Sequence, residues 1–398
     1  MSEWKECKLG ELGTVVTGKT PSKNNPEDWG DAMPFITPSD YKYYGKMASR
    51  SERNLSIVGV DRLSNKVLPV NSILVTCIGS DMGKVAMNQI KVITNQQINS
   101  IIPDVDIVNN NFLYYRLVDM YKTLRIYGGD GTAVPIVNKG DFESIETEIP
   151  PLPEQRAIAS VLSSLDDKID LLHRQNKTLE AMAETLFRQW FVEGVEEGWE
   201  ERPLSFYGNI ICGKTPSKKV QNYFNGDTPF IKIPDMHGNV FLFDTADSLT
   251  DAGKLSQPNK TLPSKSICVS CIATVGLVSF NAKESQTNQQ INSIVPHEEY
   301  YRYYLYLTMR SSYDLLHAMA SGGTATLNLN TGDFSKIPVL YPDQSVLETF
   351  HREIKPLFDK IFFNQSQIRT LEKLRDNLLP KLMSGEVRVK FEQQEAGT

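Results

Sequence analysis

The chain has 398 residues, of which 40% are hydrophobic and 23% are charged, and its formal net charge at pH 7 is −6. This length allows two or three domains with full cores, and the composition is ordinary for a globular protein. An acidic balance argues against a protein that binds nucleic acid with its whole surface. Any affinity for DNA would have to come from local basic loops.

Neither a membrane span nor a signal peptide is expected. No apolar run approaches 18 residues, and the N-terminus lacks a charged segment followed by an apolar one. Five cysteines are too few and too unevenly placed for a disulfide framework, which favours a reducing cytoplasm. They are Cys7, Cys77, Cys212, Cys268 and Cys271.

Residues 1–150 are predicted to form a first globular region of the α+β class. Strand-like runs occur near 14–17, 35–37, 73–78 and 84–87. An amphipathic helix over about 111–126 follows, then a glycine-rich loop at 128–131 and a last strand. We expect a small, strongly twisted sheet or a partial barrel.

Residues 151–198 hold a long helix, predicted over about 153–190. Apolar positions step alternately by four and three residues for more than four heptads, which is a coiled-coil seam. An isolated helix cannot bury such a seam, so it needs a partner. The expected core positions are Ile158, Leu162, Leu165, Ile169, Leu172, Asn176, Leu179 and Leu186.

Residues 199–340 repeat the first globular region in the same order. The run G-K-T-P-S-K at 18–23 recurs at 213–218, and T-N-Q-Q-I-N-S-I at 94–101 recurs at 287–294. The second copy is expected to carry its helix over about 298–320 and its glycine loop at 321–324. This is a tandem duplication, and two copies suggest pseudo-twofold symmetry.

Residues 341–398 hold the second long helix and a C-terminal tail. Its heptad seam makes it the natural partner of the first, and an antiparallel pair would place the globular regions at opposite ends. Each seam has one asparagine at a core position, which costs stability but fixes the register. The expected core positions are Leu347, Ile354, Leu357, Ile361, Asn364, Ile368, Leu371 and Leu378.

Two patterns that suggest chemistry are weak. The phosphate-loop pattern G-x-x-x-x-G-K-[ST] fits 13–20 and 208–215, but β-branched residues fill the loop and no long helix follows. The pair Cys268 and Cys271 lacks the second pair that a zinc site needs. We therefore expect no catalytic, cofactor or metal site in this chain.

Two diverged globular regions, each followed by a long helix that opens with P-L-P-E-Q or Y-P-D-Q, resemble the DNA-specificity subunit of a type I restriction-modification system. The closing L-L-P-K-L-M-S-G-E-V at 378–387 is similar as well, and the resemblance covers essentially the whole chain. It implies two target-recognition domains, each reading half of a bipartite asymmetric site in double-stranded DNA, with the antiparallel helices as a spacer.

The resemblance also implies partners. Methyltransferase subunits, two per chain, would dock on the helices, and restriction/translocase subunits would join them. The chemistry would then belong to those subunits, which use S-adenosylmethionine, ATP and Mg, and the assembly would need no membrane.

Candidate DNA contacts fall into two classes. The repeated G-K-T-P-S-K motif offers phosphate contacts, which give affinity without sequence information. Base contacts are expected where the copies diverge, chiefly over 40–53 and 235–240, and in the variable loops at 79–91 and 273–286; the alternative is a solvated loop. The phosphate candidates are Lys19, Lys23, Lys214 and Lys218. The other candidate DNA contacts are Thr20, Lys42, Tyr43, Tyr44, Lys46, Arg50, Arg53, Lys84, Thr215, Lys219, His237 and Asn239.

The repeated glutamines have a different expected role. Glutamine can pair with adenine, but residues identical in both copies cannot discriminate between two different half-sites. Gln96, Gln97, Gln289 and Gln290 are therefore expected to frame the fold through hydrogen bonds. Two other functions remain open at this point: a coiled-coil scaffold with two recognition regions that do not bind DNA, and a phosphate-loop NTPase.

Overall fold

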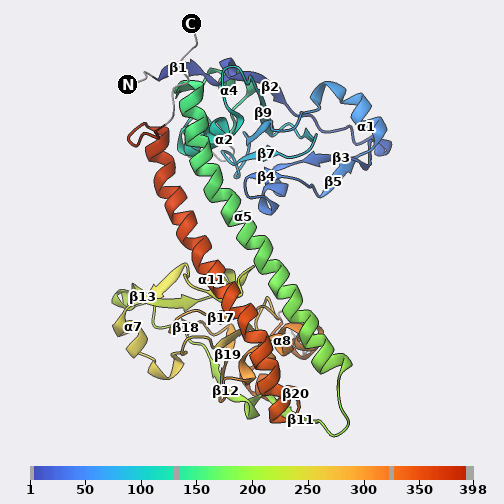
Figure 1. Ribbon diagram of the computed structural model, residues 1–398, viewed down its shortest axis with the longest axis vertical. Coiled ribbons are helices and arrows are strands. Elements are labelled where there is room, and N and C mark those ends of the chain that lie inside the picture. Colours follow the sequence, from blue (N-terminus) through green and yellow to red (C-terminus); the bar gives the residue numbers. More distant parts are fainter. Residues whose placement is uncertain (1–3, 130–134, 322–326, 391–398) are drawn as a thin grey trace. The chain divides into compact units, whose positions relative to one another are not determined.

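The structure is a computed structural model that describes residues 4–129, 135–321 and 327–390 (Figure 1). The chain forms two compact units, unit 1 with residues 1–171 and 370–398, and unit 2 with residues 172–369. Each unit contains one globular region, called head 1 (4–150) and head 2 (199–340), and a part of each long helix. Both long helices are thus divided between the units. The sequence instead predicts the helical segments 151–198 and 341–398 as regions separate from the heads.

Head 1 contains ten strands and four helices within its described residues. The strands are β1 (Lys5–Lys8), β2 (Gly13–Thr17), β3 (Trp29–Ile36), β4 (Met47–Ala48), β5 (Arg53–Leu55), β6 (Ile73–Thr76), β7 (Val85–Asn88), β8 (Ile93–Thr94), β9 (Ile98–Pro103) and β10 (Glu146–Ile149). The helices are α1 (Ile57–Arg62), α2 (Asn110–Asp119), α3 (Tyr121–Tyr127) and α4 (Lys139–Ser144).

Head 2 repeats these elements. Its strands are β11 (Glu200–Pro203), β12 (Gly208–Cys212), β13 (Phe224–Ile231), β14 (Phe241–Leu242), β15 (Asp247–Leu249), β16 (Ile267–Ser270), β17 (Val278–Asn281), β18 (Gln286–Thr287), β19 (Ile291–Pro296) and β20 (Pro338–Tyr341). Its helices are α6 (Ile233–Met236), α7 (Asp251–Leu255), α8 (Tyr301–Ser311), α9 (Tyr313–Ala320) and α10 (Thr331–Ser335).

The sheets of the two heads have the same topology. Head 1 has a five-stranded sheet of order β2-β9-β6-β7-β4, a three-stranded sheet β5-β3-β8 and the pair β1-β10. Head 2 has β12-β19-β16-β17-β14, β15-β13-β18 and β11-β20. The duplication read from the sequence is therefore a duplication of the fold, and the α+β class is confirmed.

The central strand of each five-stranded sheet is buried on both faces. In β6, Ile73 and Val75 face a core that includes α2 and the start of the first long helix, while Leu74 faces the core beside the three-stranded sheet. In β16, Val269 and Cys268 divide in the same way between two cores. This explains why these strands read as continuous apolar runs without polar alternation.

The single helix predicted in each head is two helices in the structure. The first ends at Asp119 and the next begins at Tyr121, with Met120 between them in a near-bridge conformation (φ −76°, ψ 9°). In head 2 the break falls at Ser312, whose hydroxyl donates a 2.7 Å hydrogen bond to the Thr308 carbonyl. Neither break contains the glycine or proline that would have marked it in the sequence.

The two long helices are α5 (Leu152–Arg188), which continues as a π-helix over Gln189–Glu193, and α11 (Gln344–Met383). In unit 1, the start of α5 packs with Leu382 and Met383 at the end of α11. In unit 2, Phe191 near the end of the first helix contacts Phe350 near the start of the second, with ring centroids 4.7 Å apart. The pairing is therefore antiparallel within each unit.

All of the predicted seam positions are buried or half-buried. Leu357 is only half-buried, and the adjacent Phe358 is 1% exposed and stacks on Tyr303 of α8 at 4.5 Å. The second seam therefore turns toward head 2 at this point, because it packs on a head as well as on a helix. No helix in the described part of the chain is long and apolar enough to cross a membrane.

Candidate nucleic-acid interface

The G-K-T-P-S-K segment of head 1 is fixed to the repeated N-Q-Q-I-N turn. The backbone amide of Lys19 donates to the Thr94 carbonyl at 2.9 Å, and the Thr20 hydroxyl donates to the Gln96 side chain at 2.6 Å. Gln96 itself is exposed. Backbone and side-chain bonds together therefore hold an exposed lysine and an exposed amide in a defined place on the surface.

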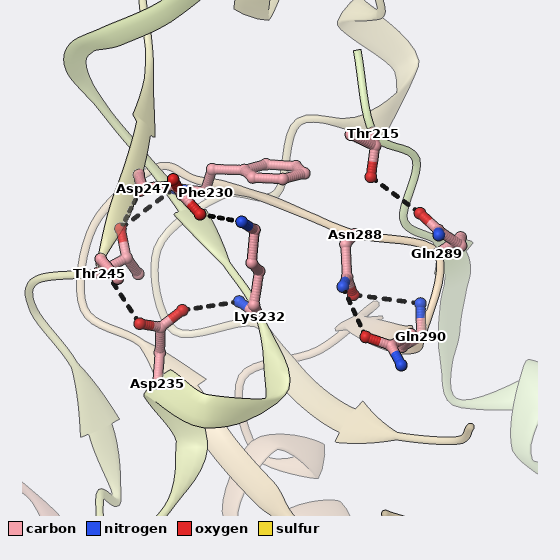
Figure 2. Close-up of polar contacts among 10 residues, drawn as sticks. Thr215, Phe230, Lys232, Asp235, Thr245, Asp247, Asn288, Gln289 and Gln290 are labelled. Carbon is pink, nitrogen blue, oxygen red and sulfur yellow. Dashed lines mark hydrogen bonds and ion pairs between the residues drawn. The ribbon is translucent and has the colours of Figure 1, made fainter. Parts of the chain in front are cut away.

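Head 2 makes the same contacts with its own copy of the segment. The backbone amide of Lys214 donates to the Thr287 carbonyl at 2.9 Å. The Thr215 hydroxyl donates to Gln289 at 2.8 Å (Figure 2). Gln257 adds a bond from its side-chain nitrogen to the Lys214 carbonyl at 2.6 Å. The position of this loop is thus set by the fold in both heads.

The second glutamine of the repeated motif closes the turn, as predicted. In head 1, Asn95 donates to the Gln97 side chain at 2.9 Å and accepts from the Gln97 amide at 3.1 Å. In head 2, Asn288 and Gln290 make the same two bonds at 2.8 and 3.1 Å (Figure 2). These amides are occupied in maintaining the turn, so Gln97 and Gln290 serve as framing residues.

The glycine of G-K-T-P-S-K is required by a close approach of backbone. A Cβ on Gly18 would lie 2.2 Å from the carbonyl oxygens of Thr94 and Asn95, and one on Gly213 would lie 2.1 Å from that of Asn288. The preceding residues form β2 and β12, which are paired along their lengths with β9 and β19. The resemblance to a phosphate loop is therefore incidental, since those amides belong to a sheet.

In the divergent loop of head 1, side chains form an exposed cluster around Glu52. Lys42 and the Tyr43 hydroxyl both donate to this carboxylate, at 2.8 and 3.0 Å, and the hydrogen bond from Lys42 lowers the carboxyl pKa. The Arg50 guanidinium lies 4.9 Å from the Tyr43 ring centroid. Tyr44 donates its hydroxyl to the Arg50 carbonyl. The loop is thus a preorganised basic and aromatic surface.

Lys46 is the exception among the predicted DNA contacts in this loop. Its ammonium group bonds to the Ser163 hydroxyl of α5 at 2.9 Å and lies 4.7 Å from the Tyr115 ring centroid. Burial lowers the pKa of Lys46, although Asp166 and Asp167 oppose that shift. The residue attaches head 1 to the long helix within unit 1, and we correct its assignment from DNA contact to structural anchor.

One aspartate in each head holds the loop that follows the central strand, β3 or β13, of the three-stranded sheet. In head 1, Asp40 accepts from the amides of Thr37 and Glu52 at 2.7 and 2.8 Å. In head 2, Asp235 accepts from the amides of Lys232 and Ala246 at 2.8 and 2.9 Å (Figure 2). Both loops have the same anchor, although their sequences and lengths differ.

The side chains on this common frame differ between the heads. In head 1 the Arg53 guanidinium stacks on Trp29, 3.3 Å from the ring centroid. In head 2, Lys232 and Asp247 form an ion pair instead. This pair borders a pocket of about 350 Å³ whose lining also includes Lys218 and Phe230.

The other predicted contacts are exposed, and two of them bond to neighbouring residues. Lys84 pairs with Asp81 at 2.6 Å, and the Asn239 side chain bonds to the Asp235 carbonyl at 3.1 Å. The parts of the glycine loops at 130–131 and 322–324 lie outside the described residues. Exposed on the surface are Lys23, Lys218, Lys219 and His237.

No metal or thiol chemistry is found in the described residues. None of their histidines, cysteines and acidic residues form a group that could hold a metal ion. Cys268 and Cys271 are buried in different cores, and burial raises the pKa of both thiols to about 12. Thiols that resist ionisation are poor nucleophiles and poor ligands.

Sequence reasoning missed three residues of this interface: Trp29, Lys232 and Asp247. Trp29 begins β3, Lys232 directly follows β13, and Asp247 begins the three-residue strand β15. Aligning the two copies strand by strand would have placed Arg53 opposite Asp247, an exchange of charge at one position. That signal was available only once the register of β5 and β15 was known.

Comparisons with known proteins agree with the geometry. Residues 1–181 and 196–372 each match the type I restriction modification DNA specificity domain. The HindI specificity subunit of Haemophilus influenzae is 32% identical, over 97% of this chain and all of that protein. The MjaIX specificity subunit of Methanocaldococcus jannaschii is 30% identical, over 97% of this chain and 94% of its own.

The fold is also found in a solved structure. The S subunit of a type I restriction-modification system from M. genitalium aligns with a TM-score of 0.61 at 16% identity. The alignment covers 99% of this chain and 97% of that one. At this identity the match supports the fold.

Proposed function

Because the chain belongs to the family of type I restriction-modification DNA specificity domains, as a specificity subunit and thus the non-catalytic component, we propose that each head reads one half of a bipartite DNA site. The site would be asymmetric and double-stranded. Methylation and cleavage would be carried out by partner subunits, which supply S-adenosylmethionine, ATP and Mg.

One observation carries this proposal: the two heads present different side chains on the same frame. The anchors Asp40 and Asp235 are equivalent, as are the bonds from Thr20 and Thr215 to the repeated glutamines. A reader of two different half-sites needs a constant scaffold and variable contact residues. Arg53 in head 1 and Asp247 in head 2 are such variable residues on a constant scaffold.

Phosphate contacts would come from the constant part of the frame. Lys19 and Lys214 are exposed, and their backbone amides are fixed by the equivalent carbonyls of Thr94 and Thr287. Cations at the same place in both heads can bind any duplex, because phosphates carry no sequence information. These lysines would supply affinity and fix the position of the protein on the duplex, while the divergent loops would supply sequence specificity.

The long helices would dock methyltransferase subunits, one for each unit. Two large apolar side chains are exposed on the helices of unit 1, Leu171 (38%) and Leu374 (45%). Unit 2 exposes Met182 (48%) and Phe363 (59%) in the same way. Exposed apolar side chains on the long helices of each unit support one methyltransferase subunit per unit, hence two per chain, and restriction/translocase subunits would join that assembly.

The decisive experiment is co-expression of this chain with its methyltransferase subunit, followed by mapping of methylated adenines in the host genome. We expect one bipartite motif. Replacing residues 40–53 by the corresponding loop of a relative with a different specificity should change one half of the motif and leave the other intact. A motif that changes in both halves, or in neither, would contradict the division of labour between the heads.

A salt titration tests the phosphate contacts separately. For specific binding by the purified complex, the logarithm of the association constant should fall linearly with the logarithm of salt concentration. Lys19→Ala should reduce that slope by about 1 while leaving the preferred sequence unchanged. Binding that does not respond to salt would contradict the assignment.

A further inference from the structure

We propose that one structural position, Arg53 in head 1 and Asp247 in head 2, selects a base in each half-site. This inference rests on the proposed function and names the residues that carry its specificity. Arg53 would recognise guanine. Asp247 would recognise a base that presents an amino group in the major groove, which is cytosine or adenine.

The register of the strands establishes that the two positions are equivalent. Arg53 pairs with Phe35 on β3, and Asp247 pairs with Phe230 on β13. Each partner strand has its bulge at the same place, before Met33 in head 1 and before Thr228 in head 2.

The backbone at this position is held identically in both heads. In head 1, Ser51 accepts from the Phe35 amide at 3.2 Å and donates to the Arg53 carbonyl at 2.7 Å. In head 2, Thr245 accepts from the Phe230 amide at 3.2 Å and donates to the Asp247 carbonyl at 2.6 Å (Figure 2). The Cα is therefore presented in the same way, and only the side chain differs.

Arg53 has the geometry of a base reader. Its side chain is exposed, and stacking on Trp29 restrains the guanidinium plane before any ligand arrives. Within the described residues it forms no ion pair, so no carboxylate competes for its five N–H donors. A planar guanidinium of this kind pairs bidentately with O6 and N7 of guanine in the major groove.

Asp247 has the opposite chemistry at the same place. Its carboxylate is half-exposed and paired with Lys232, beside a pocket lined by Phe224 and Phe230. A carboxylate accepts hydrogen bonds, so it would select the amino group of cytosine or adenine and disfavour the acceptor face of guanine. The adjacent Lys232 can donate to a neighbouring acceptor and compensate the carboxylate's charge near phosphates.

The partner residue has changed together with the reader. Thr37 and Lys232 are equivalent, because each donates its amide to the anchoring aspartate of its head. A lysine at position 37 would lie beside Arg53 and repel it, whereas Lys232 lies beside an acid. The two positions therefore form a matched pair in each head. In head 1, Arg53 lies beside a neutral threonine, and in head 2, Asp247 lies beside a lysine.

The test uses the complete complex of this chain with its methyltransferase subunit. Motif preference is measured for Arg53→Lys, Asp247→Asn and wild type on a library that randomises both half-sites. Arg53→Lys keeps the charge and the ring contact but loses the bidentate fork. Lys122→Ala, which removes an exposed cation on α3, is the matched control. Thermal unfolding checks that each variant is folded.

We expect Arg53→Lys to reduce the preference for guanine at one position of the first half-site by about 5-fold to about 150-fold. The second half-site should stay unchanged and so report that the complex is intact. Asp247→Asn tests one position of the second half-site, and its effect depends on the base that the wild type prefers there. If that base is cytosine, preference should shift toward adenine, which asparagine pairs with; if it is adenine, the preference should persist.

The inference fails if wild type reads a bipartite motif and Arg53→Lys leaves every base preference unchanged. It also fails if the variant weakens binding equally for all sequences, since Arg53 would then contact phosphate. The proposed function fails in a different way: the wild-type complex would then show no sequence preference in either half-site.

Discussion

Asn364 of α11 donates a hydrogen bond of 2.9 Å to the side-chain oxygen of Asn176 of α5, within the apolar seam of unit 2. Both side chains are buried, at 0% and 6% exposure, and both were predicted to lie at core positions. Asn364 reaches Asn176 only when the two helices meet in this register. A slip of either helix would bury unpaired amides.

The asparagine pair predicts opposite effects for single and double replacement. Asn364→Leu should destabilise by about 1–3 kcal/mol, because Asn176 is left buried without its donor. Replacing both residues by leucine should restore or exceed wild-type stability, since an apolar pair fits the seam. Urea unfolding monitored by circular dichroism measures both. A double variant as unstable as the single one would show that the hydrogen bond is not the cause.

The glycine at the G-K-T-P-S-K turn predicts a steric effect. Gly18→Ala places a Cβ against two carbonyl oxygens and should destabilise head 1 by about 1–3 kcal/mol through displacement of the turn. Gly45→Ala is the control, because nothing lies within 4 Å of its Cβ position. The melting temperature of each variant is the measurement, and that of Gly18→Ala should be lower than that of Gly45→Ala. Equal melting temperatures would contradict the close approach of the backbone at Gly18.

The heads also differ by a paired exchange in their cores. Gln286 in head 2 is fully buried and accepts from Gln257 at 2.8 Å. The equivalent positions in head 1 hold Ile93 and Leu63, which share an apolar cluster. Head 2 thus has a hydrogen-bonded pair where head 1 has an apolar pair.

This exchange predicts that substitutions at the two positions are energetically coupled. Gln257→Leu should cost about 1–3 kcal/mol, since the Gln286 side chain and the Lys214 carbonyl both lose a donor. Adding Gln286→Ile recreates the apolar pair of head 1 but also removes the donor to the Lys254 and Gln257 carbonyls. The double variant should therefore be less destabilised than the sum of the two single variants. A double-mutant cycle in urea measures the coupling, and additive effects would contradict it.

His351 predicts a pH dependence of unfolding. Its ring stacks on Tyr303 at 5.3 Å, and burial lowers its pKa below the ordinary 6.5. Glu299 and Asp359 oppose this shift, while Arg302 and Lys355 support it.

The unfolded chain therefore binds the proton more readily than the folded one. The stability contributed by neutral His351 is fully present above about pH 6.5 and is lost as pH falls toward the folded pKa. In His351→Phe that loss should be absent. The urea midpoint of wild type should fall more between pH 7.5 and 5.5 than that of the variant, and equal falls would contradict the prediction.

Much of the fold could be read from patterns repeated within the chain. The heptad steps located both long helices to within a few residues, and the duplication predicted equivalent strands in the two heads. The break at Met120 could not be read, because no residue there disfavours a helix on its own. Lys46 was misassigned for a similar reason: an exposed basic loop and a lysine that reaches a neighbouring helix look alike in sequence.

The candidate site divides in the same manner. Gln97 and Gln290 could be predicted as structural residues because they are identical in the two copies. Identical residues cannot distinguish two different half-sites. The relationship between Arg53 and Asp247 emerged only from strand register. Strands of three residues carry too few side chains to fix their own pairing, so their neighbours in the sheet decide it.

The sequence by itself determined the two-copy plan, the long helices and the location of asparagine within each seam, because local periodicity and repetition are properties of the chain alone. The tertiary structure decided which basic side chains face outward, which residues share an equivalent place in the two heads, and where the second seam turns to pack on a head. Those outcomes depend on contacts between residues far apart in the chain, and no local pattern records such contacts.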